Sequence, residues 1–526
     1  MDSFAGNRLT FQETDEADTA ITAFIYSEHD DGASKQPAGR VDVMNPSTAA
    51  TTSWLDQPLI KSLSDVFLPS GYPHSVSEDY LPYQIFSQIK DSLQAFCSSI
   101  AGLLSSRAVL QGVGVGNADA SPTSALLLHI LQDSSGRVAT ILFAHRVGTA
   151  LEPECKTYRL AADVFNDIAM ILDCLSPGVP AGYMRVTVLS TAGVLRALCG
   201  VAGGSSKASL SAHFARWGNL AELNAKDSSQ ETVISLVGML VGSLVVSHVT
   251  SLSTTWAALL FLLGLHLSMN YAAVRAVQMT SLNRQRANIV FSTLLSSDPD
   301  LNIEALASGS GSTIQEKKKR VSRSSSLKTT PEKWKLLTPA EVAEQERIFP
   351  KDGALEWISY QPEKQHQPIK QNIGSAAIGV PLSKFFGDTN TSTSSTKGII
   401  SSTSSSFKTS LPITQLSTLF EEEAYLFFPC PSPSKKGRWH ASILLKKGCS
   451  KQDRLKAWAH ALLAVWVLNG QKDANDPAQI LDIVSRTLAF MSEQSRFERY
   501  MMALAAVGWD LDVAALETSG GRRVCF

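Results

Sequence analysis

Charged and amide side chains follow one face of the segment 156–172, KTYRLAADVFNDIAMIL. At 100° per residue in an α-helix, five of them fall within an arc of about 100°. They are Lys156, Arg159, Asp163, Asn166 and Asp167. Two cations, two anions and an amide predict either a self-neutralising network or a site for a zwitterionic or phosphorylated ligand. The alternative is an ordinary solvent-exposed face, although the remaining faces of this helix are apolar.

A second polar group stands just before the longest apolar stretch of the chain. Its members are His213, Arg216, Lys226, Asp227, Gln230 and Glu231. His213 and Arg216 are three residues apart, so both can contact one group from a helix. Asp227 and Glu231 have a structural alternative, because carboxylates at a helix start bind free backbone N–H groups and complement the helix dipole. If the apolar stretch crosses a membrane, these residues lie at its mouth, where a transport or binding site is expected.

No motif indicates a known catalytic, nucleotide or metal site. GVGVG (112–116) has its third glycine one residue too early for a dinucleotide fingerprint, and Ser206 precedes Lys207 where a phosphate loop requires glycine. The seven cysteines are scattered without metal-ligand spacing. We therefore predict no metal and no catalytic residue, and no cofactor is indicated. An enzyme that uses the 156–167 face is the least favoured hypothesis.

The apolar stretch runs from Thr232 to Val274, 43 residues without Asp, Glu, Lys or Arg. One membrane crossing needs about 20 residues, so the stretch predicts a hairpin of two crossings joined at TSLSTT (250–255). Gly238 and Gly242 form a GxxxG pattern that lets two helices approach closely. Cationic residues flank both ends, which predicts that both chain termini face the cytosol, while the organelle is not indicated. Two buried helices of a soluble core are the alternative interpretation.

The overall composition predicts a mainly α fold: a helical, membrane-embedded domain followed by a smaller α+β domain. Hydrophobic residues make up 44% of the 526 residues and charged residues 18%, and the net charge of −1 gives no reason to expect nucleic acid as a partner. The predicted parts are a disordered segment 1–60, a helical domain 61–295, a basic Ser-rich linker 296–335, and a C-terminal domain 336–526 that low-complexity sequence interrupts at 388–410. The acidic N-terminal residues do not predict a transit or signal peptide.

Two patterns define the C-terminal half. EEAYLFFP (422–429) and HASILLKK (440–447) predict strands, and DRLKAWAHALLAVWVL (453–468) and 478–506 predict helices.

In the linker, Lys317, Lys318, Lys319, Arg320 and Arg323 form a cationic cluster that favours an anionic membrane surface. Phosphorylation would weaken that contact by adding negative charge. The neighbouring acceptor candidates are Ser322, Ser324, Ser325 and Ser326.

Five ordered blocks resemble the domain of the root UV-B sensitive (RUS) family over residues 65–295, and the C-terminal region resembles the family more loosely. The blocks are GYPHSVSEDYLPYQ (71–84), QAFCSSIAGLLSSRAVLQGVGVG (94–116), KTYRLAADVFNDIAMILDCLSP (156–177), GVAGGSSKASLSAHFA (200–215) and AKDSSQET (225–232). The resemblance implies a membrane-bound protein linked to UV-B responses and vitamin B6 homeostasis, without an agreed molecular activity. A chloroplast role is not expected for this chain, because its acidic N-terminus does not resemble a plastid-targeting segment.

These observations together predict a transporter-like or ligand-binding protein in small-molecule (vitamin B6-type) or membrane homeostasis. The alternative is a membrane-tethered scaffold that recruits protein partners through its C-terminal domain. The expected partners are membrane lipid and a family paralogue or a second copy of the chain.

Overall fold

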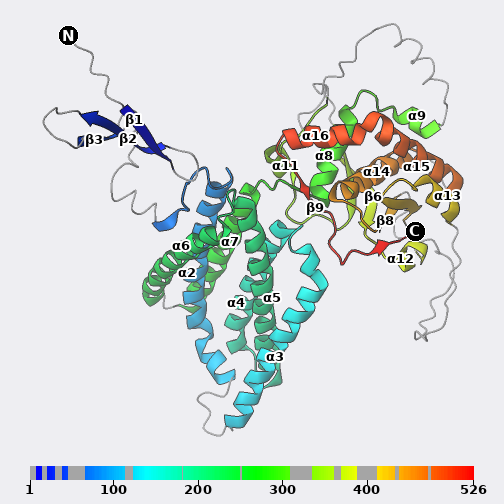
Figure 1. Cartoon of the computed structure of the whole chain (residues 1–526). Coiled ribbons are helices and arrows are strands. Elements are labelled where there is room, and N and C mark those ends of the chain that lie inside the picture. Colours follow the sequence, from blue (N-terminus) through cyan, green and yellow to red (C-terminus); the bar gives the residue numbers. More distant parts are fainter. Residues whose placement is uncertain are drawn as a thin grey trace. The chain divides into compact units, whose positions relative to one another are not determined.

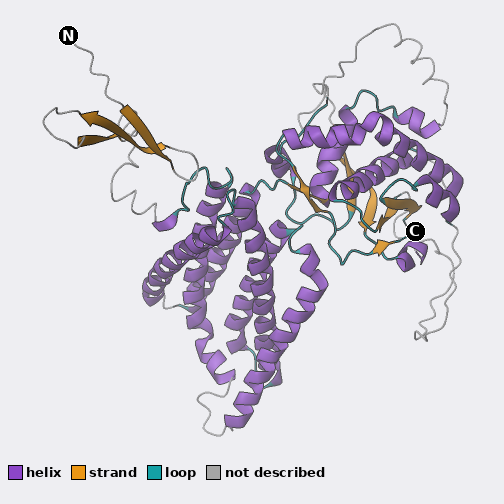
Figure 2. Cartoon of the chain, viewed as in Figure 1, coloured by secondary structure: helices purple, strands orange, loops and turns teal. Residues whose placement is uncertain are grey.

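The computed structural model describes residues 8–14, 20–29, 38–44, 66–112, 122–180, 182–248, 251–308, 334–359, 369–387, 411–432, 438–471 and 476–525. The chain divides into two compact units, the first formed by 1–104 with 208–273 and the second by 105–207 with 274–526. Most described residues are helical, and the sheets lie near the N-terminus and in the C-terminal half (Figures 1 and 2). The prediction of a mainly α chain with an α+β C-terminal region is confirmed. The linker cluster 317–326, the tract 388–410 and residues 113–116 lie outside the described residues.

The N-terminal segment contains a small antiparallel sheet, where the sequence predicted disorder. Strands β1 (Arg8–Thr14), β2 (Ala20–His29) and β3 (Ala38–Met44) pair in that order. Phe11 stands opposite Phe24, and Phe24 stands opposite Val43. This register places apolar residues of neighbouring strands opposite one another, although the composition of the segment is polar. The prediction of disorder, which rested on composition, is wrong for these three segments.

The first unit contains α2 (Tyr80–Gly112), α6 (Leu220–His248) and α7 (Leu252–Ala276). Residues 105–112 of α2 and 274–276 of α7 lie beyond its limits. A Cβ atom added to Gly238 would stand 2.6 Å from the Ser92 carbonyl oxygen, and one added to Gly242 would stand 2.9 Å from the Phe96 ring. The predicted close approach at the GxxxG pattern is therefore confirmed, and the partner helix is α2. From the first contact to the second, the residue numbers rise by four on both helices, so α2 and α6 run parallel.

The start of α6 corrects one prediction. The helix begins at Leu220 and is anchored there by Leu223, which is buried. Asp227 and Glu231 consequently lie seven and eleven residues after the first helical residue and do not cap the N-terminus of α6. The predicted turn between the two apolar segments is confirmed, since α6 ends at His248 and α7 begins at Leu252.

The second unit contains α3 (Pro122–Val147), α4 (Cys155–Leu175) and most of α5 (Tyr183–Phe214), with short 3-10 turns at Gly148–Ala150 and Ser176–Gly178. Asp173 of α4 binds Arg196 of α5, and Ala162 of α4 lies against Gly203 of α5. The residue numbers rise on one helix as they fall on the other, so α4 and α5 pack antiparallel. Residues 200–209 form the middle of α5, which confirms that this segment is not a phosphate-binding loop.

The rest of the second unit is an α+β layer. The larger sheet has the order β10 (Arg523–Val524), β8 (Trp439–Lys446), β6 (Ile369–Ile378), β5 (Ala354–Ser359), and β7 (Tyr425–Pro431) also pairs with β8. β4 (Ser281–Asn283) pairs with β9 (Asp510–Ala515). The helices are α8 (Arg284–Ser297), α9 (Ile303–Ser308), α11 (Pro339–Gln345), α12 (Leu382–Gly387), α13 (Ile413–Leu419), α14 (Lys451–Asn469), α15 (Pro477–Ser492) and α16 (Arg496–Ala506).

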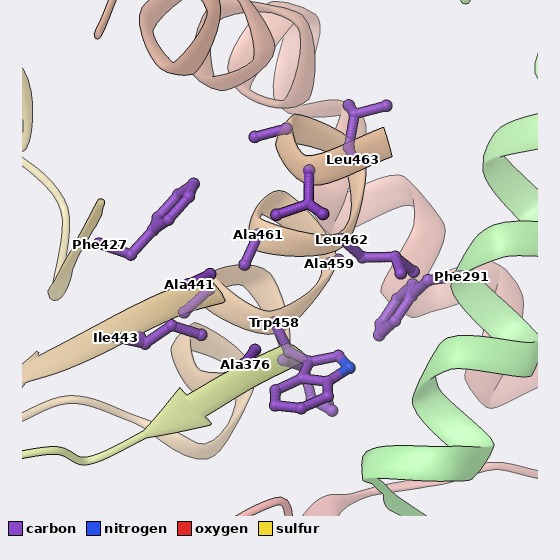
Figure 3. Packing of buried hydrophobic residues seen from close by; sticks show 14 of the residues in the cluster. Phe291, Ala376, Phe427, Ala441, Ile443, Trp458, Ala459, Ala461, Leu462 and Leu463 are labelled. Carbon is purple, nitrogen blue, oxygen red and sulfur yellow. The ribbon is translucent and has the colours of Figure 1, made fainter. Parts of the chain in front are cut away.

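Helix α14 forms the centre of this core, because almost every face of it is buried. Its Trp458 and Leu462 lie among Phe291 of α8 and Ile443 of β8 (Figure 3). The Trp458 indole N–H donates to Asn288 Oδ1 at 2.9 Å, which satisfies its polar atom. The predicted strands and the helix at 453–468 are confirmed. The predicted helix 478–506 is two helices, broken at a 3-10 turn, Glu493–Ser495.

Within the part of the chain that the structure describes, three helices are long and apolar enough to cross a membrane: α5, α6 and α7. Only 17%, 11% and 33% of their most apolar windows are buried within the protein. Leu244 of α6 is 66% exposed and Phe261 of α7 is 71% exposed. The sequence predicted the α6–α7 pair but not α5, because Arg185, Arg196 and Lys207 interrupt its apolar run. An exposed apolar surface of this extent is typical of contact with lipid or another protein.

Candidate functional site

Polar side chains gather between α2 and α6, the two helices that pack closely at the GxxxG pattern. Gln84 Nε2 donates to Asp227 Oδ1 at 2.6 Å and to Gln230 Oε1 at 2.8 Å. Gln88 Nε2 reaches the same Gln230 oxygen at 3.0 Å, and Gln230 in turn donates to the Phe67 carbonyl at 2.6 Å. Residues 84 and 88 are i and i+4 on α2, and 227 and 230 are i and i+3 on α6, so each pair shares one helix face.

A buried carboxylate–imidazole pair belongs to the same unit. His213 Nε2 lies 2.9 Å from Asp79 Oδ2, and their side chains are 6% and 3% exposed. Ser77 Oγ donates to the other Asp79 oxygen at 2.5 Å, which fixes the carboxylate. Tyr80 is the next residue after Asp79, and burial together with the negative charge of Asp227 raises the pKa of its hydroxyl to about 12. We call Asp79, Gln84, Gln88, His213, Asp227 and Gln230 the polar cluster.

A cavity of about 540 Å³ opens in the same unit. Ser77, which binds Asp79 of the polar cluster, lines it together with Arg216 and Glu78. The rest of its wall comes from the block that opens the helical region: Tyr72, Pro73, His74, Val76, Leu81 and Pro82. The cavity therefore reaches the polar cluster at Ser77. Donors, acceptors and a cation at one cavity can bind a small polar molecule, whereas no nucleophile activated by a base is present in the polar cluster.

The predicted residues at the mouth of the apolar stretch separate into two groups. His213, Asp227 and Gln230 belong to the polar cluster, and Arg216 lines the neighbouring cavity. Lys226 and Glu231 are half-buried elsewhere on α6. Asp79, Gln84 and Gln88 were not predicted as site residues, because each meets its partner across more than 130 positions of sequence. Asp79 and Gln84 belong to the block 71–84 that resembles the RUS family, and that resemblance was the sequence signal that could have identified them.

The charged face of α4 is buried, so its interpretation as a solvent-exposed face is wrong. Asp163 and Asp167 are buried, and Arg159 and Asn166 are half-buried. The apolar side chains Ile168 and Leu175 are the exposed ones, at 43% and 48%. Arg159 and Ala162 both lie close to Gly203 of α5. In α4 the acidic side chains Asp163 and Asp167 are therefore buried while two apolar side chains are exposed.

Lys156 stands apart from the other residues of that face. Its Nζ binds Glu346 Oε2 at 2.7 Å, and Arg286 Nη1 binds Glu346 Oε1 at 2.8 Å, all three side chains being buried. Burial alone would raise the pKa of the Glu346 carboxyl, but Arg286 and Lys156 outweigh it and hold that pKa below its usual value. Lys156 is thus a structural residue of the second unit. Among the described residues, no three His, Cys, Asp or Glu side chains are placed to hold a metal ion.

Residues 53–298 match the family model described as "Vitamin B6 photo-protection and homoeostasis domain". The chain is 45% identical to "RUS family member 1" of Dictyostelium discoideum over 232 residues, 44% of this chain and 43% of that protein. It is 35% identical to "Protein root UVB sensitive 3" of Arabidopsis thaliana over 246 residues, 47% of this chain and 54% of that protein. "Protein root UVB sensitive 2, chloroplastic" of the same plant is 27% identical over 254 residues, 47% of this chain and 57% of that protein. The matches thus span about half the length of these relatives. No solved structure is significantly similar.

Proposed function

Because the chain belongs to the root UV-B sensitive family and carries its vitamin B6 domain, we propose that it is a membrane-embedded protein that binds a vitamin B6-type small molecule at the polar cluster and acts as a transporter-like protein. The proposal includes membrane lipid as the partner that surrounds its exposed apolar helices.

The observation that carries the proposal is the distribution of side chains on α6. Val237, Leu240 and Leu244 are exposed, whereas Asp227 and Gln230 hydrogen-bond to α2. In water the opposite arrangement is favoured, because burying apolar area contributes about 25 cal/mol per Å². A helix with apolar groups outward and polar groups inward is typical of a protein whose solvent is lipid.

The chemistry of the polar cluster supports a ligand with several hydroxyl or ring-nitrogen groups. Gln84 and Gln230 offer amides that donate and accept, Asp227 accepts, and Arg216 supplies a cation at the cavity wall. Vitamin B6 vitamers carry hydroxyl groups and a ring nitrogen, so each polar atom of such a ligand can find a partner there. Buried polar groups that are left without partners cost about 1–3 kcal/mol each, which would make this recognition selective.

Binding of pyridoxine to the full chain in lipid nanodiscs, measured by titration calorimetry, tests the proposal. Gln84→Leu removes the amide that joins Asp227 to Gln230, and we expect a dissociation constant about tenfold higher or more. Gln94→Leu makes the same change ten residues further along α2, outside the polar cluster, and should bind as the unaltered chain does.

Uptake of labelled pyridoxine into proteoliposomes then separates a transporter from a binding protein. Accumulation that Gln84→Leu lowers and Gln94→Leu does not would support transport. If the unaltered chain binds no pyridoxine, the ligand proposal fails and the membrane-tethered scaffold becomes the better explanation.

A further inference from the structure

A cavity of about 330 Å³ lies in the second unit and has no residue in common with the polar cluster. The end of α3, the start of α4, the first turn of α8 and the segment before β5 contribute to its wall. The lining residues that matter here are Arg146, Tyr158, Arg284, Gln285, Arg347 and Lys351. Its volume is near the lower limit for small-molecule sites, so a small ligand is expected.

The charges around this cavity are unbalanced. Four cationic side chains line it, against three carboxylates. Arg284 already binds Asp352 at 2.6 Å and lies 3.8 Å from Glu154, and Arg347 lies 3.7 Å from Glu356. Arg146 and Lys351 form no ion pair with any described residue. Each carboxylate therefore has a guanidinium partner, and two cations remain to attract an anion.

The first turn of α8 adds to the positive potential. Arg284 and Gln285 are the first two residues of this 14-residue helix, and both line the cavity. The N–H of the third residue, Arg286, is bound by the Asn283 side chain at 2.9 Å. The first N–H groups of a helix have no partner within it and form the positive end of its dipole, where anions bind.

Tyr158 supplies a different kind of contact on the same wall. It stands one turn inside α4, and its ring is in edge contact with Phe143 of α3 at 6.3 Å between centroids. The Thr157 hydroxyl beside it donates to the Ile348 carbonyl at 2.5 Å, which ties the start of α4 to the segment that carries Arg347 and Lys351. The aromatic side chain is thus held in place beside the cationic groups.

We propose that this cavity binds a phosphate monoester, with the phosphate between Arg146, Lys351 and the start of α8 and the organic part against Tyr158. A phosphate monoester offers a dianion and several acceptor oxygens, which match two uncompensated cations and the positive end of the α8 dipole. Such a group is present both in small soluble metabolites and in the headgroup of phosphatidic acid.

Titration of the full chain with phenyl phosphate, in nanodiscs of phosphatidylcholine, tests the site. Arg146→Gln combined with Lys351→Gln should raise the dissociation constant about 10- to 100-fold, because two charge-assisted hydrogen bonds are lost. Both side chains are exposed and unpaired, so the melting temperature should not change. Lys447→Gln with Arg522→Gln removes the same charge from exposed positions outside the cavity and should leave binding unchanged.

A second arm separates the two sources of phosphate. If phosphatidic acid in the nanodiscs abolishes phenyl phosphate binding by the chain that retains Arg146 and Lys351, the site takes a lipid headgroup. If they do not compete, it takes a soluble monoester. The proposal is overturned if the unaltered chain shows no saturable binding of either ligand, or if both double variants lose binding equally.

Discussion

Lys156 and Glu346 stand 190 positions apart in the sequence and form a buried ion pair, with 2.7 Å between Nζ and Oε2. Arg286 binds the second Glu346 oxygen, and the Arg275 guanidinium donates to the backbone carbonyls of Ala343, Glu344 and Glu346. The carboxylate thus has two cationic partners, and the backbone around it is held by a third. This network joins α4 to the segment after α11 within the second unit.

Lys156→Met should therefore destabilise the protein and leave pyridoxine binding by the folded chain unchanged. Breaking a buried ion pair costs about 3–5 kcal/mol, and Arg286 remains to compensate part of the charge, so we expect about 3 kcal/mol. The free energy of unfolding from denaturant titration in a fixed detergent measures it. Lys447→Met, at an exposed position, is the control. A variant of normal stability that loses pyridoxine would restore Lys156 to the ligand-binding residues.

His460 should make the stability of the C-terminal core depend on pH. Its Nδ1 lies 3.0 Å from the Tyr425 hydroxyl, and its Nε2 lies 3.0 Å from Thr487 Oγ1. Burial, opposed by the hydrogen bond to the Val484 carbonyl and assisted by the charge of Lys456, lowers the pKa of this imidazole to about 3. The unfolded chain binds a proton near pH 6.5 and the folded chain does not, so stability is complete above that pH and falls as the pH decreases toward 3.

The expected slope approaches about 1.4 kcal/mol per pH unit once the pH is about one unit below 6.5, where the unfolded chain is protonated and the folded chain is not. Unfolding followed by tryptophan fluorescence between pH 7 and 5 measures it above the range where ordinary carboxylates titrate. His460→Gln keeps polar atoms for Tyr425 and Thr487 but cannot take up the proton, so its stability should vary less over the same range. Equal slopes in the two proteins would show that His460 does not cause the effect.

Features set by neighbouring residues could be predicted from the sequence. The strands at 425–431 and 439–446, helix α14, the turn before Leu252 and the small-residue contact at Gly238 all follow from local periodicity or composition. Their position just before the apolar stretch also located Asp227 and Gln230, but not Gln84 and Gln88, which bind them. Asp79 and His213 are 134 positions apart, and no helical or strand period connects such residues.

The errors have equally physical causes. The alternative interpretation of the α4 face as solvent-exposed rested on the rule that helices in water turn charge outward, whereas here Asp163 is buried and Ile168 is exposed. Helix α5 was missed as an apolar helix because Arg196 interrupts it, although that charge binds Asp173. In both cases a charge that would be costly alone is placed against a neighbouring helix, which only the tertiary structure reveals.

Gly238→Ala should disrupt the packing of α2 against α6. The added methyl group would lie 2.6 Å from the Ser92 carbonyl oxygen, and backbone atoms cannot move aside cheaply. Overpacking of this kind costs about 1–3 kcal/mol, and we expect pyridoxine binding to weaken as well, since Gln84 and Gln230 join the same helices. Thermal unfolding in nanodiscs and pyridoxine titration measure the two effects.

Gly264→Ala on α7 is the matched control, because no atom lies within 4 Å of the added methyl group. It should be neutral or stabilising by up to about 1 kcal/mol, owing to the higher helix propensity of alanine. Equal melting temperatures for Gly238→Ala and Gly264→Ala would contradict the close contact.

The contacts between the apolar helices also lead to an expectation about membrane topology. If the α6–α7 hairpin makes two crossings, as we propose, the protein should stay in the membrane during alkaline carbonate extraction. If α5 also crosses, α4 should cross with it, because Asp173 binds Arg196 and α4 exposes Ile168 and Leu175. The 21 residues of α4 suffice for a core of about 30 Å. Both helix pairs add an even number of crossings, so tags at the two termini should be equally accessible to protease in sealed microsomes. Tags on opposite sides would mean that an odd number of helices crosses and that α4 does not accompany α5.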